Sequence, residues 1–428
     1  MTPTSIASPP RLNAPTIHRH SSGLTIIAEQ IPVDAINLNL WLNVGSAVED
    51  DEINGIAHFL EHMIFKGTDR LKSGEFEAQI EQRGAVTNAA TSQDYTHYYI
   101  TTAPQDFAEL APLQMDVLFN PRIPEDAFDR ERHVVLEEIR RSDDNARRRT
   151  YQHMVDLGYD HLPYRRPVLG PTSVIEHLAP QQMRDFHSAW YHPQDVIAVA
   201  VGNLPVEKLI AIVERGYEKT AGDRGDRGRG VSPTFRSETA YTEVVRRNHL
   251  DKTLQQSRMM LLWRVPGLME LEETYALDVL ANLLGHGRTA RLVKDLREER
   301  GLVNSVGASN VSHQHQGLFC LSAHLQSENI AQVETELLVH IDRLQTELVS
   351  AADLDKVCTQ VANQFVFGNE TPSDRANLYG YYQAVMGDLT PAFEYSDRIR
   401  ALTPEAIRSA AQKYLNTKAY GFVAIRPE

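Results

Sequence analysis

The sequence of 428 residues has few cysteines, no excess of basic charge and no long apolar run. Its two cysteines, Cys320 and Cys358, cannot form a disulfide framework or a four-cysteine zinc site, and we interpret both as buried small residues. Lysine and arginine number 43 against 57 acidic residues, and the formal net charge of -14 argues against a general nucleic-acid binder. No segment approaches the roughly 18 apolar residues that a membrane span needs.

The beginning of the chain carries no basic region followed by an apolar block, so we expect no secretory signal. The first acidic residue is Glu29, and a long stretch without acid is also typical of organelle transit peptides. However, a folded pattern begins near Thr16 and leaves too short an extension for such a peptide. Together with the low cysteine content, these features predict a cytoplasmic protein.

One polar segment divides the chain. Residues 219–236 begin with KTAGDRGDRGRGVSPT, which is dense in glycine, arginine and aspartate and cannot bury a core. The whole chain has 42% hydrophobic and 23% charged residues, which is typical of globular proteins. We therefore predict two domains, 14–218 and 237–428, joined by this linker.

Both halves contain the periodic patterns of strands and helices. In the first half, alternation over 36–44 predicts a half-buried strand, and Asn54 is the expected cap of the helix that follows. The other segments predicted there are strands at 23–29, 85–102 and 196–201 and helices at 54–66, 75–83, 105–119, 124–152 and 180–191. In the second half they are strands at 257–263, from 303 onward and at 421–425, and helices at 272–284, 290–297, 330–349, 352–367 and 404–415. The repeated order predicts an α+β fold of two homologous domains, each a largely antiparallel sheet packed with helices.

The strongest chemical signal is the segment His58-Phe59-Leu60-Glu61-His62. Residues four apart share one face of a helix, so both imidazoles can reach one ion, and neutral imidazole is a good zinc ligand. The carboxylate of Glu61 projects beside the same site, where it could take a proton from a metal-bound water. This H-x-x-E-H order is the inverse of the H-E-x-x-H zincin motif. The alternative is a surface helix that carries two histidines by chance.

A zinc ion that keeps one position open needs a third protein ligand. Glu131 and Glu138 are seven residues apart in a predicted helix and share a face, whereas Glu137 points about 100° away. One carboxylate of this pair could bind the metal while the other supports a histidine. The alternative is a solvated charged helix, which the composition of ERERHVVLEEIRR alone favours.

Several segments together resemble the inverzincin metallopeptidases, the family of pitrilysin, insulin-degrading enzyme and the mitochondrial processing peptidase. The similarity covers nearly the whole chain after about residue 14. Its most specific segments are Gly45 to Glu49, Gly55 to Thr68, Asn88 to Thr91 followed by Thr96 and Tyr98, Glu131 to Glu138, Pro163-Tyr164 and Gly170. The length fits the short-chain subgroup of the processing peptidases and their bacterial relatives. The resemblance implies that each chain supplies half of a clam-shell chamber.

The resemblance also implies a role for each matching residue. It implies one zinc ion per chain, held by three ligands: His58, His62 and Glu138. Glu61 would be the general base that activates the water. Glu131 would contact a histidine ligand on the side away from the zinc. Asn88 and Ala89 would lie on the strand against which the family binds its peptide substrate as an added strand.

The second half departs from the family pattern. Members that complete the site carry an arginine and, seven residues later, a tyrosine that helps to stabilise the oxyanion. Here the arginine is Arg297, but the tyrosine position is Asn304. Loss of one oxyanion donor costs about 100- to 1000-fold in rate. We therefore expect the chain to be the metal-bearing subunit of a dimer, preferably a heterodimer with a homologue that carries the arginine–tyrosine pair.

The expected function is a zinc-dependent endopeptidase subunit that cleaves peptides or extended protein segments in an enclosed chamber. The alternatives are a non-catalytic scaffold homologue and a peptide-binding protein that holds zinc with little turnover. The net charge of -14 favours basic peptides as substrates. His313 and His315 are assigned to a polar loop rather than to a second metal site.

Overall fold

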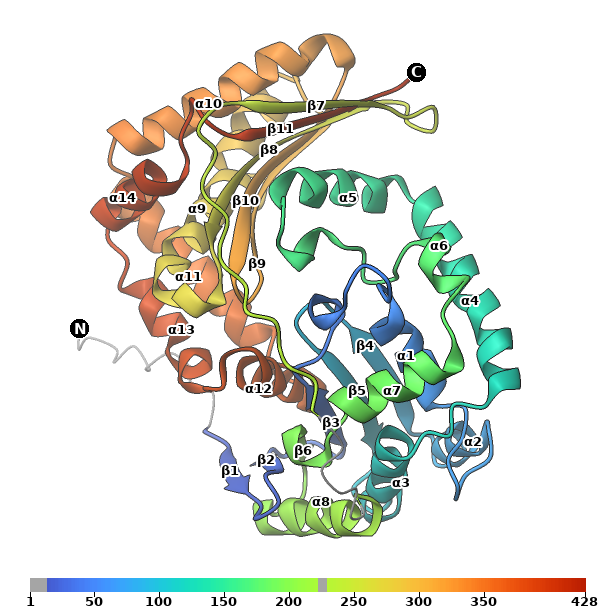
Figure 1. Cartoon of the computed structure of the whole chain (residues 1–428). Coiled ribbons are helices and arrows are strands. Elements are labelled where there is room, and N and C mark those ends of the chain that lie inside the picture. The colour runs from blue at the N-terminus through green and yellow to red at the C-terminus, as the bar shows by residue number, and fades with distance from the viewer. Residues whose placement is uncertain (1–13, 222–228) are drawn as a thin grey trace, which may run out of the picture.

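The computed structural model describes residues 14–221 and 229–428 and is built on two β-sheets (Figure 1). Part of the predicted linker, residues 222–228, lies outside the described residues. The first sheet has the strand order β1 (Thr16–Arg19), β2 (Thr25–Gln30), β6 (Ile197–Gly202), β3 (Ile36–Leu42), β5 (Thr96–Thr102), β4 (Val86–Thr91). The second has the order β7 (Val245–Leu250), β11 (Gly421–Arg426), β8 (Ser257–Pro266), β10 (Gln316–Leu325), β9 (Ser305–Ser312).

The two sheets repeat one topology. Apart from β1, each has a single parallel pair, β2 with β6 and β7 with β11, and the neighbours that follow are antiparallel. Glycines also recur at equivalent places: a Cβ on Gly45 would lie 2.3 Å from Ser92 O, and one on Gly267 would lie 2.6 Å from His313 O. Each carbonyl belongs to the first residue after the last strand in its sheet's order, in the turns β4–β5 and β9–β10. This repetition confirms the predicted α+β fold of two homologous, largely antiparallel domains.

Helices of each half bury one face of its own sheet (Figure 1). The first core receives apolar side chains from α1 (Ile56–Ile64), α2 (Glu75–Gln82), α3 (Phe107–Phe119), α4 (Glu125–Asp144), α6 (Thr172–Ile175), α7 (Pro180–Trp190) and α8 (Val206–Thr220). The second core receives them from α9 (Tyr275–Gly285), α10 (Ile330–Thr346), α11 (Ala351–Phe367), α13 (Thr390–Arg400) and α14 (Pro404–Tyr414). Cys320 and Cys358 are buried, as expected.

The opposite face of each sheet is covered by a helix from the other half. Helix α12 (Pro372–Met386) packs on β3 and β6, where Tyr379 joins Trp41 and Val199 in one apolar cluster. Helix α5 (Ala146–Gly158) packs on β8 and β11, where Leu157 meets Leu262. Because each sheet thus buries apolar residues on both faces, the two halves are joined by exchanged helices rather than by the linker alone.

This exchange corrects the expectation of a half-buried strand at 36–44. All seven residues of β3 are buried. Its polar side chains find partners instead of water: Asn37 donates to Thr101 Oγ1 at 2.9 Å, and Asn39 donates to Asn377 Oδ1 of α12 at 2.8 Å. Buried amides need hydrogen-bond partners. The asparagines of this strand therefore alternate with apolar residues because they face polar protein groups, and not because they face solvent.

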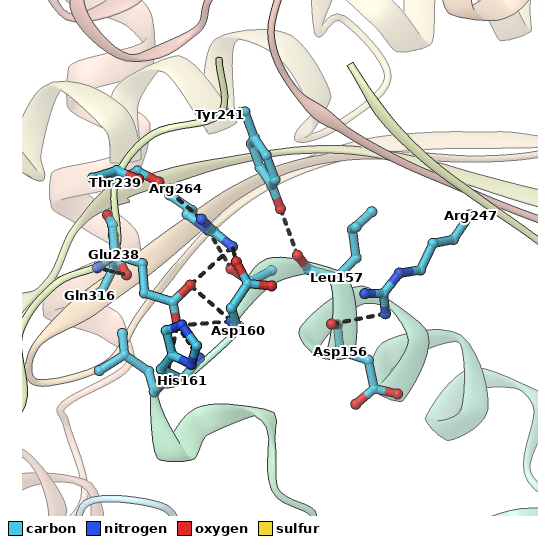
Figure 2. A network of polar contacts seen from close by, with 12 residues as sticks. Asp156, Leu157, Asp160, His161, Glu238, Thr239, Tyr241, Arg247, Arg264 and Gln316 are labelled. Carbon is cyan, nitrogen blue, oxygen red and sulfur yellow. Dashed lines mark hydrogen bonds and ion pairs between the residues drawn. The ribbon is translucent and has the colours of Figure 1, made fainter. Parts of the chain in front are cut away.

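Figure 2 shows the polar contacts that hold the end of α5 against the second half. Arg264 of β8 donates to Gly158 O and to Asp160, each at 2.7 Å. Tyr241 donates to Leu157 O at 2.7 Å. Glu238, just after the linker, accepts the backbone N–H of Asp160 at 2.8 Å. Arg264 and Tyr241 thus satisfy two carbonyl groups that the last turn of a helix leaves without partners.

The predicted helices were inaccurate or incomplete at other places. The predicted helix 124–152 is two helices, because Asn145 adopts an extended conformation and its side chain accepts the N–H of Arg147 at 2.9 Å to start α5. The predicted helix 290–297 is present, but its part from Val293 to Glu299, η5, is a π-helix. Helices α8, α12 and α13 were not predicted. Within the described residues, no helix is both long and apolar enough to cross a membrane.

The contact between α12 and β3 leads to a stability prediction. Gly380 of α12 faces the Trp41 ring, and a Cβ there would lie 2.1 Å from Nε1. Alanine normally stabilises a helix interior by about 0.5–1 kcal/mol relative to glycine, but overpacking costs about 1–3 kcal/mol. We expect Gly380→Ala to lower the free energy of unfolding, measured by urea denaturation. The control is Gly368→Ala at an exposed position, where a Cβ would lie no closer than 3.1 Å to another atom, Gln364 O, and it should lower the free energy of unfolding less.

Candidate metal centre

The start of α1 is held by a buried carboxylate. Glu49 accepts the backbone N–H groups of Gly55 and Ala57, each at 2.8 Å, and the side chain of Asn54 at 2.8 Å. Burial raises the pKa of Glu49 to about 7, although these hydrogen bonds oppose the shift. Glu49 therefore satisfies the free donors at the helix start, which is the role that the sequence had assigned to Asn54.

The structure brings together the three side chains that were expected to bind a metal. His58 Nε2 and His62 Nε2 lie 3.5 and 3.6 Å from the same oxygen, Glu138 Oε2, and the ligand atoms of all three lie within 4.8 Å of one another. In a tetrahedral zinc site with bonds of about 2.0–2.1 Å, two ligand atoms are about 3.4 Å apart. The donor types and their spacing therefore fit zinc.

Glu131 lies directly behind His62. Its Oε1 is 2.9 Å from His62 Nδ1, and its Oε2 is 2.7 Å from Lys66 Nζ. Burial opposes ionisation of Glu131, but His62 and Lys66 outweigh it and lower its pKa. An ionised Glu131 accepts a hydrogen bond from Nδ1–H of His62, which leaves the lone pair on Nε2 free for a metal ion beside Glu138.

His58 is suited to act as a neutral ligand. Its side chain is buried, and burial together with the charges of His62 and Arg148 lowers its pKa to about 3. Its Nδ1 is also buried and has no hydrogen-bond partner among the described residues. The neutral ring keeps a lone pair for a metal at Nε2, which faces Glu138.

Glu61 reaches the site from the same helix and is fixed by the first sheet. Its Oε2 accepts a hydrogen bond of 2.6 Å from Thr91 Oγ1, at the end of β4. Burial raises the pKa of Glu61, and the nearby Glu138 adds to the shift. A carboxyl group with a raised pKa is a stronger base than an exposed one. Sequence reasoning did not assign roles to Thr91 or Lys66, although both lie in segments that carried the resemblance.

Asn88 and Ala89 lie on β4, the edge strand of the first sheet. Within the described residues β4 pairs with β5 alone, and the backbone N–H of Ala89 donates to Oδ1 of the preceding Asn88 at 2.9 Å. Such an edge can accept a further strand. The strand ends at Thr91, which binds Glu61, so an added peptide would run towards the metal cluster.

Arg297 and Asn304 lie elsewhere. Arg297 belongs to η5 and pairs with Glu298 at 2.6 Å. Asn304 is exposed just before β9, and its backbone N–H donates to His324 O at 2.8 Å. Within the described residues, neither side chain forms a hydrogen bond or ion pair with the metal cluster. The structure thus groups the ligands and Glu61 in the first half and leaves these two residues apart.

The predicted polar loop at His313 and His315 contacts the first half. His313 lies at the turn between β9 and β10, is buried and stacks on Tyr164, with ring centroids 4.2 Å apart. The backbone N–H of His315 donates to Tyr164 Oη at 3.1 Å, and Tyr164 in turn donates to Asp94 at 3.0 Å. This loop therefore belongs to the contact between the halves, and within the described residues the only metal-type cluster is the one at His58, His62 and Glu138.

A helix with the H-x-x-E-H order and a distal glutamate that converges on it defines the inverted-zincin type of metallopeptidase site. Comparisons with known proteins agree. The family described as "Insulinase (Peptidase family M16)" matches residues 25–172, and "Peptidase M16 inactive domain" matches residues 177–361. The chain therefore belongs to the M16 peptidase family.

Relatives extend this similarity over most of the chain. An "Uncharacterized zinc protease" of Rickettsia felis is 25% identical over 402 residues, which cover 94% of this chain and 95% of the relative. "Zinc protease PqqE" of Helicobacter pylori is 26% identical and covers 95% of this chain and 91% of its own. The crystal structure of a protease from Helicobacter pylori superposes with a TM-score of 0.89 at 25% identity, covering 97% of this chain and 100% of the other.

The two neighbouring glutamates of α4 give a matched test of the metal centre. Glu138 faces the histidines, whereas Glu137 is paired with Arg140 and Arg141 at 2.8 and 3.1 Å. We expect Glu138→Ala to weaken zinc binding by more than about 100-fold, because a ligand is lost, and Glu137→Ala to leave it unchanged. Zinc content by mass spectrometry and competition with a chelator measure this difference. Equal zinc affinity in the two variants would contradict the assignment of Glu138.

Proposed function

We propose that this chain is the metal-bearing subunit of a zinc-dependent endopeptidase. The convergence of His58, His62 and Glu138, with Glu61 fixed beside them, carries the proposal. Zinc held there would supply Lewis-acid activation of a peptide carbonyl and of a water molecule. The names of the relatives, which are zinc proteases, support the same chemistry.

The side chains of the chain divide the remaining work. Glu61 is placed to accept a proton from the attacking water and to pass it to the leaving amine, and Thr91 holds its carboxylate in position. Glu131 keeps His62 in the tautomer that a ligand needs. The edge of β4 at Asn88 and Ala89 binds the substrate as an extended strand, so the substrates are peptides or unfolded protein segments rather than folded proteins.

Replacing Glu61 distinguishes the role of the general base from the role of the metal ligands. Glu61→Gln keeps the size of the side chain but cannot accept a proton, so we expect zinc to remain bound and peptide cleavage to fall by at least about 100-fold. A fluorogenic peptide assay and zinc analysis on the same preparation measure both properties. A Glu61→Gln variant with full activity would refute the proposed mechanism.

We further propose that the site is completed by a second chain. Arg297 and Asn304 do not contact the metal cluster of their own chain, and Asn304 stands where family members that complete the site carry a tyrosine. A homodimer would therefore lack one oxyanion donor. The favoured partner is a homologue with the arginine–tyrosine pair, and the heterodimer of the two would be the active form.

Assembly and catalysis can be tested together. The pure chain should cleave peptides slowly, and Asn304→Tyr should raise this activity by about 10-fold or more, because one oxyanion donor is worth about 100- to 1000-fold. Asn248→Tyr, on the exposed strand β7, is the control and should have no effect. Strong activity of the pure chain that depends on Arg297 and Asn304 would contradict the need for a partner.

A non-catalytic scaffold remains the alternative function. The second half, which matches an inactive-domain family, lacks the H-x-x-E-H motif, but the ligand set of the first half is complete. Stoichiometric zinc in the purified chain supports a peptidase, and its absence supports the scaffold. If the wild type is instead a peptide-binding protein with little turnover, it would bind zinc and peptides but cleave them as slowly as we expect of the Glu61→Gln variant.

A further inference from the structure

A cavity of about 960 Å³ lies next to the start of α1, the helix that carries His58 and His62. It lies between the end of α4, the start of α5 and the segment 164–172. Ile139, which lines it, follows the ligand Glu138, and Gln93, which also lines it, lies two residues beyond Thr91. Its wall also includes Leu169, which packs on the start of α1: a Cβ on Gly55, about one turn before His58, would lie 2.7 Å from Leu169 O. The cavity is therefore bounded by segments that adjoin α1 and α4, the two helices of the metal centre.

The lining of the cavity is strongly basic. It contains four arginines, Arg147, Arg148, Arg149 and Arg166, and a single acidic residue, Asp143. Apolar groups such as those of the segment 167–171 form much of the remaining wall. A positive charge beside apolar walls interacts more strongly with an anion than the same charge in open water.

Two of these arginines are already neutralised within the chain. Arg149 pairs with Asp251 of the second half at 2.6 Å, and Arg166 pairs with Asp51 at 3.0 Å. By contrast, Arg147 and Arg148 have no carboxylate within ion-pair distance among the described residues. Arg148 is exposed, and among the described residues its guanidinium hydrogen-bonds to Ser142 Oγ alone, at 3.4 Å, which leaves most of its donors available.

The start of α5 is a rigid platform for Arg148. Asn145 caps the helix, Arg149 ties its first turn to the second half, and the opposite end is fixed by the contacts of Figure 2. A guanidinium held on a fixed helix loses less freedom when it binds, and its planar donors match the two oxygens of a carboxylate.

We propose that this cavity receives an acidic side chain of the peptide substrate close to the scissile bond, with Arg148 binding its carboxylate. The proposal deepens the peptidase function and rests on it. The net charge of -14 favours basic peptides, but charges beyond about 8–10 Å are largely screened. The lining of the cavity, rather than the sum over the surface, sets the potential that a bound side chain experiences.

Two peptides that differ only in glutamate or lysine at the residues flanking the cleaved bond test the preference. We expect the wild type to cleave the glutamate peptide with a kcat/KM at least about tenfold higher, and Arg148→Glu to reverse this order, because the charge at the contact is inverted. Arg215→Glu makes the same change of charge on the exposed face of α8, at the far side of the first half, and should leave the ratio unchanged (Figure 1). Circular dichroism checks that each variant is folded.

Binding to zinc-loaded Glu61→Gln protein separates this proposal from the peptidase function. Tighter binding of the glutamate peptide, reversed by adding Arg148→Glu, supports the acidic subsite even if the wild type shows no turnover. Cleavage without any preference for glutamate, or with a preference for lysine, overturns the subsite and leaves the peptidase function standing. Failure of both peptides to bind overturns the two proposals together.

Discussion

The structure depends on the reciprocal covering of its two sheets. Each sheet is apolar on both faces, and the face that its own helices leave open is closed by α5 or α12 from the other half. Burial of such faces is the main favourable term in folding. The exchange also adjoins the metal centre in the chain, because α5 follows directly on α4, the helix that carries Glu138 and Glu131.

Local periodicity predicts which side chains of one helix lie together. It does not predict that the two helices of the site pack against each other. The spacing of His58 and His62, and that of Glu131 and Glu138, each place two side chains on one face of a single helix. Nothing in either helix alone determines that α1 and α4 lie side by side, so the third ligand was supplied by the resemblance to a family. The role of Glu49 was not predicted because two of its three hydrogen-bond donors are backbone groups, which leave no side-chain pattern in the sequence.

Much of the fold could be predicted because strands and helices that face their own core keep a regular period. The errors have two causes: one is a distant segment that covers a strand, and the other is a local cap within a predicted helix. The strand containing Asn39 reads as half-exposed because its second neighbour, Asn377, lies 338 residues later. The break at Asn145 was missed because an asparagine is tolerated within a helix and only its hydrogen bond to Arg147 shows that a new helix begins there.

The exchanged helices also determine how the protein can be divided. A fragment that ended before the second half would retain α5 without the sheet that it covers and would expose the face of the first sheet around Trp41. Isolated halves are therefore expected to aggregate, since large exposed apolar faces associate. Cleavage within the linker of an intact molecule would instead leave one particle, held by α5, α12 and contacts such as Arg264 with Asp160. Two separately encoded halves could form this protein only if they folded in each other's presence.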